Sequence, residues 1–154
     1  MTKVTFLVGL PASGKSTWRE HCRGDAHVAS SDDFIEMIAK ESGKTYNDVF
    51  AETIQVATKH FNNVINHAIA ANVDLIIDRT NTNAVGRLKI LSRIPHDWKK
   101  VAVVFKCLDF EVWKRRLMNR PGKLIPASVI TDMMMKFEKP TVYEGFHEII
   151  EYYT

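Results

Sequence analysis

The chain has few of the features that mark secreted or membrane proteins. It contains only two cysteines, Cys22 and Cys107, which lie far apart in the sequence. No apolar run approaches the ~18 residues that a membrane span needs, and no repeat, low-complexity segment or linker interrupts the 154 residues. We therefore expect reduced thiols, a cytoplasmic protein without a membrane partner, and a single domain over residues 1–154.

The overall charge and composition exclude few classes of function. The net charge is +3, with 45% hydrophobic and 25% charged residues, which is ordinary for a globular protein. This charge is too mild to indicate a nucleic-acid partner by itself, and the six histidines show no metal-ligand spacing. Any functional assignment therefore depends on the motifs.

The most informative motif lies in residues 9–17, whose sequence GLPASGKST fits the pattern G-x-x-x-x-G-K-[S/T]. A short apolar run precedes it and a helix-compatible stretch follows, which is the context that a Walker A phosphate-binding loop requires. Because residues 4–8 lead straight into the loop, they are not a signal peptide. Lys15 would reach the β- and γ-phosphates of ATP, and Ser16 would hold Mg²⁺. The predicted cofactor-binding residues of the loop are Gly9, Pro11, Ala12, Ser13, Gly14, Lys15, Ser16 and Thr17.

Strand-like and helix-like segments alternate along the chain. Strands are expected at residues 4–9, 27–30, 73–78 and 101–107, and helices from residue 31, over about 45–71, and at 84–92, 110–119 and 126–137. The tail after residue 140 is expected to add a short strand or to lie across the sheet. The alternation predicts an α/β fold with a parallel sheet of four to five strands and helices on both faces. Ligands of such sheets bind at the carboxyl ends of the strands.

Acidic residues follow two of the expected strands. Asp32 or Asp33 would accept the proton of an attacking hydroxyl, and the alternative is that they cap the helix that begins there. Asp78 ends an apolar run, as a Walker B acid does. It would bind Mg²⁺, directly or through water, or hydrogen-bond Ser16; the alternative is an acid in a turn.

A basic segment without acids lies between Glu111 and Asp132. Arg116 and Arg120 are four residues apart and share a helix face, and a Pro-Gly break follows them that would hinge a helical lid over about residues 113–127. Arginines that close over a triphosphate stabilise the transferring phosphoryl group. The alternatives are a solvated basic face and a contact with a nucleic-acid backbone. The basic residues are Lys114, Arg115, Arg116, Arg120 and Lys123.

Four motifs, in this order and spacing, resemble the kinase domain of phage-type 5′-polynucleotide kinases. They are residues 9–18 (GLPASGKSTW), 30–34 (SSDDF), 78–83 (DRTNTN) with Arg87, and the pattern R-x3-R-P-G-K-x-I-P over residues 116–126. The resemblance covers nearly the whole chain, including Pro140 and Tyr143. It implies a P-loop kinase fold, ATP with Mg²⁺, and 5′-hydroxyl ends of DNA or RNA as acceptors in nucleic acid end repair. For a phage-encoded enzyme the compartment would be the host cytoplasm.

The resemblance also implies roles for individual residues. Asp32 would activate the 5′-hydroxyl, and Ile125 would pack on the terminal nucleobase. Catalysis would use Asp32, Lys15, Arg116 and Arg120, the two arginines also contacting the nucleotide. The implied substrate-binding residues are Asp32, Asp33, Arg79, Thr80, Asn81, Arg87 and Ile125, and the implied metal ligands are Ser16 and Asp78.

Three departures from this family pattern stand out. Ile35 replaces an arginine that grips a substrate phosphate, and Arg79 replaces an acid, so that the acid of this segment is Asp78. The phosphatase signature Asp-x-Asp-Gly-Thr is absent from the sequence, and we expect no phosphatase domain. Arg79 is the candidate for the missing cation.

The sequence favours a polynucleotide 5′-hydroxyl kinase, and two alternatives stay open. One is a kinase of a small molecule, such as a nucleoside, sugar or nucleotide-sugar, which would share every ATP-site residue. The other is a nucleotide-dependent switch or toxin-like binding module without kinase activity. The oligomeric state and the choice between DNA and RNA do not follow from the sequence.

Overall fold

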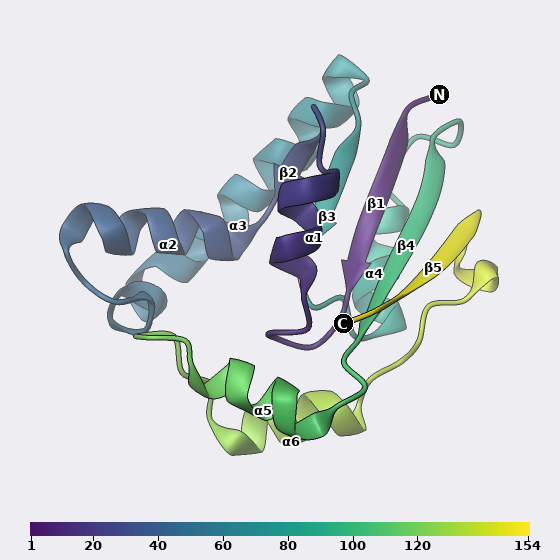
Figure 1. Cartoon of the computed structure of the whole chain (residues 1–154). Helices are drawn as coiled ribbons and strands as arrows, with labels where there is room; N and C mark the ends of the chain where they lie inside the picture. The colour runs from purple at the N-terminus through teal and green to yellow at the C-terminus, as the bar shows by residue number, and fades with distance from the viewer.

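Five parallel strands form one sheet in the order β2-β3-β1-β4-β5 in the computed structural model, which describes residues 1–154 (Figure 1). The strands are β1 (Lys3–Val8), β2 (His27–Ala29), β3 (Leu75–Asp78), β4 (Lys99–Lys106) and β5 (Glu148–Tyr153). The helices are α1 (Lys15–Cys22), α2 (Ser31–Ser42), α3 (Tyr46–Ala71), α4 (Ala84–Leu91), α5 (Phe110–Met118) and α6 (Ala127–Met135), with a 3₁₀ turn η1 (Val142–Glu144) before β5. The expected fold is confirmed, and the tail contributes the fifth strand.

The sheet register brings the predicted motifs to one edge. Strand β1 lies between β3 and β4, pairing Leu7 with Asp78 and Val8 with Val104. Strand β2 pairs with the other side of β3. Because all pairs are parallel, the segments that follow β1, β2, β3 and β4 leave the sheet at the same edge. The phosphate loop, the Asp-Asp pair and Asp78 therefore become neighbours.

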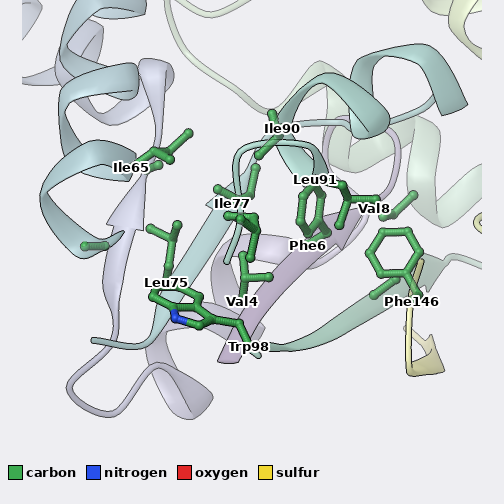
Figure 2. Packing of buried hydrophobic residues seen from close by; sticks show 14 of the residues in the cluster. Val4, Phe6, Val8, Ile65, Leu75, Ile77, Ile90, Leu91, Trp98 and Phe146 are labelled. Atoms are coloured by element: carbon green, nitrogen blue, oxygen red, sulfur yellow. The ribbon is translucent and has the colours of Figure 1, made fainter. Parts of the chain in front are cut away.

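The two faces of the sheet are covered unequally. On one face α3 and α4 pack against alternate side chains of β1, β3 and β4, and Phe6 meets Phe146 edge-on at 5.4 Å (Figure 2). On the other face the short helix α1 packs through Trp18, whose ring lies 6.2 Å from that of Phe105. Helix α2 packs on α3 through its own small cluster, which contains Ile35. No helix is both long and apolar enough to cross a bilayer.

Side-chain caps and glycines set the helix ends near the acidic motif. The hydroxyl of Ser30 accepts a hydrogen bond from the backbone N–H of Asp33 and caps α2, so neither aspartate of the pair is the cap. Thr45 and Asp48 form a reciprocal capping box at the start of α3. Helix α6 is shorter than expected, because it begins after Pro126 and ends at Met135.

Arg87 is a structural residue, which corrects the substrate-binding role that the resemblance implied. Its side chain is completely buried. The guanidinium donates to both carboxylate oxygens of Glu144 at 2.7 and 3.1 Å, and to the carbonyls of Asn81 and Glu138 at 2.7 and 2.8 Å. These bonds tie α4 to the loop after β3 and to the segment that leads into β5.

Replacing Arg87 with methionine is expected to lower the free energy of unfolding by about 3–5 kcal/mol, because it leaves buried acceptors without a partner. Urea unfolding followed by tryptophan fluorescence measures the change. Lys89→Met, on the exposed side of the same helix, is the control and should be nearly neutral. A loss below about 1 kcal/mol in Arg87→Met would contradict the structural role.

Candidate active site

A cleft of about 1130 Å³ opens at the carboxyl edge of the sheet. Its walls are the phosphate loop, the start of α2, the end of β3, one side of α3, and the segment predicted as a lid, residues 113–127. Of the residues predicted from the sequence, it is lined by Pro11, Ala12, Ser13, Gly14, Lys15, Ser16, Thr17, Asp32, Asp33, Asp78, Arg79, Thr80, Arg116, Arg120 and Ile125. Gly9, Asn81 and Arg87 do not line it.

Contacts from distant parts of the chain hold the phosphate loop in shape. Gly14 has a φ of 104° directly before α1, a conformation that favours glycine. The indole Nε1 of Trp113 donates to the carbonyl of Pro11 at 2.8 Å, and the Thr154 hydroxyl donates to the carbonyl of Ser13 at 3.0 Å. Sequence reasoning missed Trp113, whose only signal is an aromatic side chain within the predicted helix 110–119. Helix α5 therefore supports the loop as well as carrying Lys114, Arg115 and Arg116. The prediction that Arg116 and Arg120 share a helix face is wrong, because α5 ends at Met118 and Arg120 lies in the turn that follows.

Lys15 is folded back onto its own loop. Its ammonium donates to the carbonyls of Gly9 and Leu10 at 2.7 and 2.9 Å. Burial lowers the pKa of Lys15 to about 8, and the nearby charge of Asp78 opposes this change. The positive charge of Arg120 adds to the lowering. The lysine is therefore a cation that gains from a bound anion.

Two polar atoms beside the loop fit a triphosphate. Nη1 of Arg120 and the hydroxyl of Ser13 are buried and have no hydrogen-bond partner. Buried donors without partners are costly, and phosphate oxygens between the loop and Arg120 would satisfy them. The donor set of the loop, Lys15 and Arg120 therefore suits a polyphosphate.

Arg116, the other arginine predicted to contact the nucleotide, makes different contacts from those of Arg120. Arg116 lies exposed on α5 and donates to the Thr154 hydroxyl at 3.2 Å, with the sulfur of Cys107 at 3.8 Å. It lines the cleft, but its side chain is directed to the end of β5 and the segment after β4. Arg116 and Arg120 thus face different parts of the cleft.

Arg19 joins the two acidic motifs, and sequence reasoning missed it. Its Nη1 lies 2.7 Å from Asp78 Oδ2 and 3.0 Å from Asp33 Oδ2, and its Nη2 donates to Asp33 Oδ1 at 3.2 Å. Burial raises the pKa of Asp78, although Arg19 acts against this. The spacing of four residues from Lys15 is the signal that could have found Arg19, because it places both on one face of α1.

Asp32 and Asp33 have different partners although they are adjacent. Asp33 is paired with Arg19, whereas one carboxylate oxygen of Asp32 accepts a 2.6 Å hydrogen bond from the Tyr46 hydroxyl. Burial raises the pKa of Tyr46, and the hydrogen bond to Asp32 raises it further. The Asp32 side chain is 56% exposed and faces the open cleft. Asp33 also lines the cleft, with 47% of its side chain exposed, but Arg19 contacts both of its carboxylate oxygens. Of the two acids, Asp32 is therefore the one that Arg19 leaves available to a hydroxyl group.

Two residues that follow β3 have different roles: Arg79 faces the cleft, and Asn81 holds the loop in place. The guanidinium of Arg79 lies 3.5 Å from the centre of the Phe61 ring, and its closest polar partner is the Ser31 hydroxyl at 3.5 Å. Asn81, in contrast, has a φ of 51°, is buried, and donates to the carbonyl of Leu7 at 2.7 Å. This corrects the predicted substrate-binding role of Asn81, which instead fixes the β1 and β3 ends together.

A main-chain contact accounts for the positions of two further predicted residues, Gly9 and Thr80. The N–H of Gly9 donates to the carbonyl of Thr80 at 2.9 Å, so this contact joins the phosphate loop to the segment after β3. Thr80 still lines the cleft. Gly9 therefore contributes to the loop's position rather than to the cleft wall.

One wall of the cleft is mostly apolar. It is formed by α3 on one side and by α6 with the segment before it on the other, on the Asp32 side of the cleft. Helix α3 contributes Tyr46, Phe50, Ile54 and Thr58. The other side contributes Leu124, Ile125, Pro126, Val129 and Met133. This wall can pack against a flat or apolar group.

The chain has no cluster of three or more His, Cys, Asp or Glu side chains that would hold a metal by themselves. Mg²⁺ does not need one, because it usually binds through one or two protein oxygens plus substrate phosphates. Ser16 and Asp78 both line the cleft beside the loop and fit this requirement.

Comparisons with known proteins agree with this fold. A family model described as "AAA domain" matches residues 4–140. A candidate kinase from Chloroflexus aurantiacus j-10-fl is similar with a TM-score of 0.68 at 14% identity, covering 99% of this chain and 85% of that chain. A sugar kinase from Janibacter sp. has a TM-score of 0.64 at 20% identity, covering 99% and 86%. Shikimate kinase from Acinetobacter baumannii, in complex with shikimate, has a TM-score of 0.56 at 19% identity, covering 99% and 84%.

At these identities the likenesses to solved structures show the fold alone, which is that of the P-loop kinases. The family match extends over most of the sequence. The chain belongs to the AAA domain family.

Proposed function

We propose that this protein transfers the γ-phosphate of ATP to the 5′-hydroxyl end of DNA or RNA. The observation that carries the proposal is the apolar wall on the Asp32 side of the cleft, together with the guanidinium of Arg79, which lines the same cleft and lies over the Phe61 ring. A nucleoside end presents a flat base, a hydroxyl and a neighbouring phosphate, and these match the wall, Asp32 and Arg79 in turn.

On the donor side, the loop N–H groups, Lys15 and Arg120 hold the phosphates of ATP. Ser16 and Asp78 would hold Mg²⁺, which would supply positive charge against the phosphates of ATP. Arg120 stabilises the charge that develops on the transferred phosphoryl group. Phosphoryl transfer needs positioning and charge stabilisation rather than a covalent enzyme intermediate.

On the acceptor side, Asp32 accepts the proton of the attacking hydroxyl. Arg79 is prepared for an anion, because stacking on the buried Phe61 fixes its plane and no carboxylate pairs with it. Ile35 contributes nothing here, since its side chain is completely buried between α2 and α3. Ile125 in the apolar wall packs on the terminal base.

A small-molecule acceptor is the second candidate, and two observations favour it. The fold is shared with a sugar kinase and with shikimate kinase, and the arginine that grips a substrate phosphate in the polynucleotide kinase pattern is lost, because a buried Ile35 occupies its position. Against it, a polyol acceptor needs several hydrogen-bonding side chains, and the polar residues that α3 contributes to the cleft are already bonded within the protein. The Tyr46 hydroxyl bonds Asp32, the Asn47 amide bonds Leu124, and the Thr58 hydroxyl bonds the carbonyl of Ile54.

A panel of acceptors tests the proposal. Labelled ATP and Mg²⁺ are incubated with thymidine, thymidine 3′-phosphate, a 5′-hydroxyl trinucleotide, gluconate and shikimate. We expect the trinucleotide and the 3′-phosphate to have kcat/KM values about 10–100-fold above thymidine, the value of one charged hydrogen bond. Arg79→Ala should remove this advantage and leave thymidine unchanged. Equal kcat/KM for thymidine and the trinucleotide, or preferred transfer to a polyol, would overturn the polynucleotide assignment.

Asp32→Asn is expected to lower kcat by about 10²–10⁴-fold, with little change in the KM for ATP, because a base acting on the acceptor proton matters mainly in the transition state. Asp33→Asn is the matched comparison, one residue along the same helix turn, and should be milder since Asp33 is paired with Arg19. Steady-state kinetics decide the order. A larger loss in Asp33→Asn would move the catalytic role to Asp33.

ATP binding near pH 8 is expected to take up about half a proton, because bound phosphate favours the charged form of Lys15 and raises its pKa from about 8. Calorimetry in two buffers with different ionisation enthalpies measures the uptake. Lys15→Met should abolish it. The same uptake in both proteins would mean that another group titrates.

A further inference from the structure

The turn that follows α5 carries two cations into the cleft. We call residues 120–124 the lid turn. The N–H of Lys123 donates to the carbonyl of Arg120 at 3.1 Å and closes the turn. Arg120 lies beside the phosphate loop and contributes to lowering the pKa of Lys15, whereas the ammonium of Lys123 lies 3.4 Å from Asp32 Oδ2. One short turn therefore connects the donor and acceptor sides.

Asn47 docks the lid turn against the start of α3. Its backbone N–H donates to the carbonyl of Gly122 at 2.9 Å, and its side-chain amide bonds both the carbonyl and the N–H of Leu124, at 3.0 and 3.1 Å. Gly122 has a φ of 68°, and a Cβ there would lie 2.6 Å from Cβ of Thr45. The contact is therefore close and depends on the main-chain path of the turn.

Lys123 is enclosed where the turn docks. Its side chain is only 16% exposed. The ammonium lies 2.6 Å from a carboxylate oxygen of Glu36 and 4.6 Å from the centre of the Tyr46 ring. A lysine between two carboxylates and an aromatic face loses much of its usual freedom, so it presents its charge to Asp32 from a fixed direction.

The two carboxylate oxygens of Asp32 contact side chains from different parts of the fold. Tyr46, at the first turn of α3, donates to Oδ1, and Lys123 of the lid turn faces Oδ2. Without the lid turn, Tyr46 alone would orient this half-exposed carboxylate. Docking of the turn therefore completes the surroundings of Asp32.

We propose that Lys123 is a positioning residue that acts through Asp32, and that docking of the lid turn by Asn47 couples the donor-side Arg120 to the acceptor acid. This inference rests on the function proposed above. The charge of Lys123 aims Asp32 at the acceptor hydroxyl, and it reaches Asp32 only while the turn is docked.

Kinetics of Lys123→Gln and Lys123→Arg test the positioning role, with Lys136→Gln as control. Lys136 lies after α6, is paired only with Asp132, and does not line the cleft. We expect Lys123→Gln to lower kcat about 10–100-fold with an unchanged KM for ATP. Lys123→Arg should recover most of the loss, and Lys136→Gln should behave like the unmodified protein.

The decisive measurement combines Lys123→Gln with Asp32→Asn. If Lys123 acts through Asp32, adding Lys123→Gln to the Asp32→Asn protein changes kcat by less than about twofold. A further loss as large as in the unmodified background would overturn the proposal, since Lys123 would then act on substrate or elsewhere. Full activity in Lys123→Gln, or no recovery in Lys123→Arg, would overturn it as well.

Hydrogen exchange tests docking without any acceptor. The amide of Leu124 should be protected in the unmodified protein, and its exchange should rise about tenfold in Asn47→Ala, which loses its side-chain bonds to Leu124. Rapid exchange in the unmodified protein would overturn docking. If no acceptor on the panel is phosphorylated while Leu124 is protected, the proposed function fails and the docked turn stands.

Discussion

The parallel register of β1 between β3 and β4 is the constraint on which the whole cleft depends. It ends three strands at one edge, so that the phosphate loop, Asp78 and the segment around Arg79 must share a small volume. Two hydrogen bonds fasten this edge by joining the ends of β1 and β3: the Asn81 side-chain amide donates to the carbonyl of Leu7, and the Gly9 N–H donates to the carbonyl of Thr80. Residues that matched the family motif thus serve the register itself as well as the cleft.

The cleft contains many charged side chains at close range, and some of them form ion pairs with one another while others have no partner. Arg19 joins Asp33 and Asp78 into a fixed ion-pair cluster beside the loop. Arg120 keeps a buried donor without a partner next to Lys15, whose pKa burial lowers to about 8. The side of the cleft next to the phosphate loop is therefore short of negative charge, which a bound polyphosphate would supply. The acceptor side is already balanced apart from Arg79.

Residues of the lid segment also contribute contacts and charge to the cleft. The lid segment contributes Trp113 to the phosphate loop and Lys123 to Asp32, so it contacts two parts of the cleft. Its helix α6 buries none of its residues, although Val129 and Met133 line the apolar wall. An acceptor base bound there would cover side chains that are otherwise in contact with water, a favourable contribution to binding.

The sequence by itself determined the fold class, the phosphate loop and 15 of the 33 residues that line the cleft, because the loop motif and the alternation of strands and helices are local patterns. The long helix α3 was predicted to its last residue for the same reason. The tertiary structure alone decided the roles that depend on distant partners. Arg87 matched a motif but is buried against Glu144, and Arg19, Tyr46 and Asn47 gain their contacts only when segments far apart in the sequence meet. Side-chain pairing across the cleft depends on direction and burial, and neither is encoded in the spacing of a single motif.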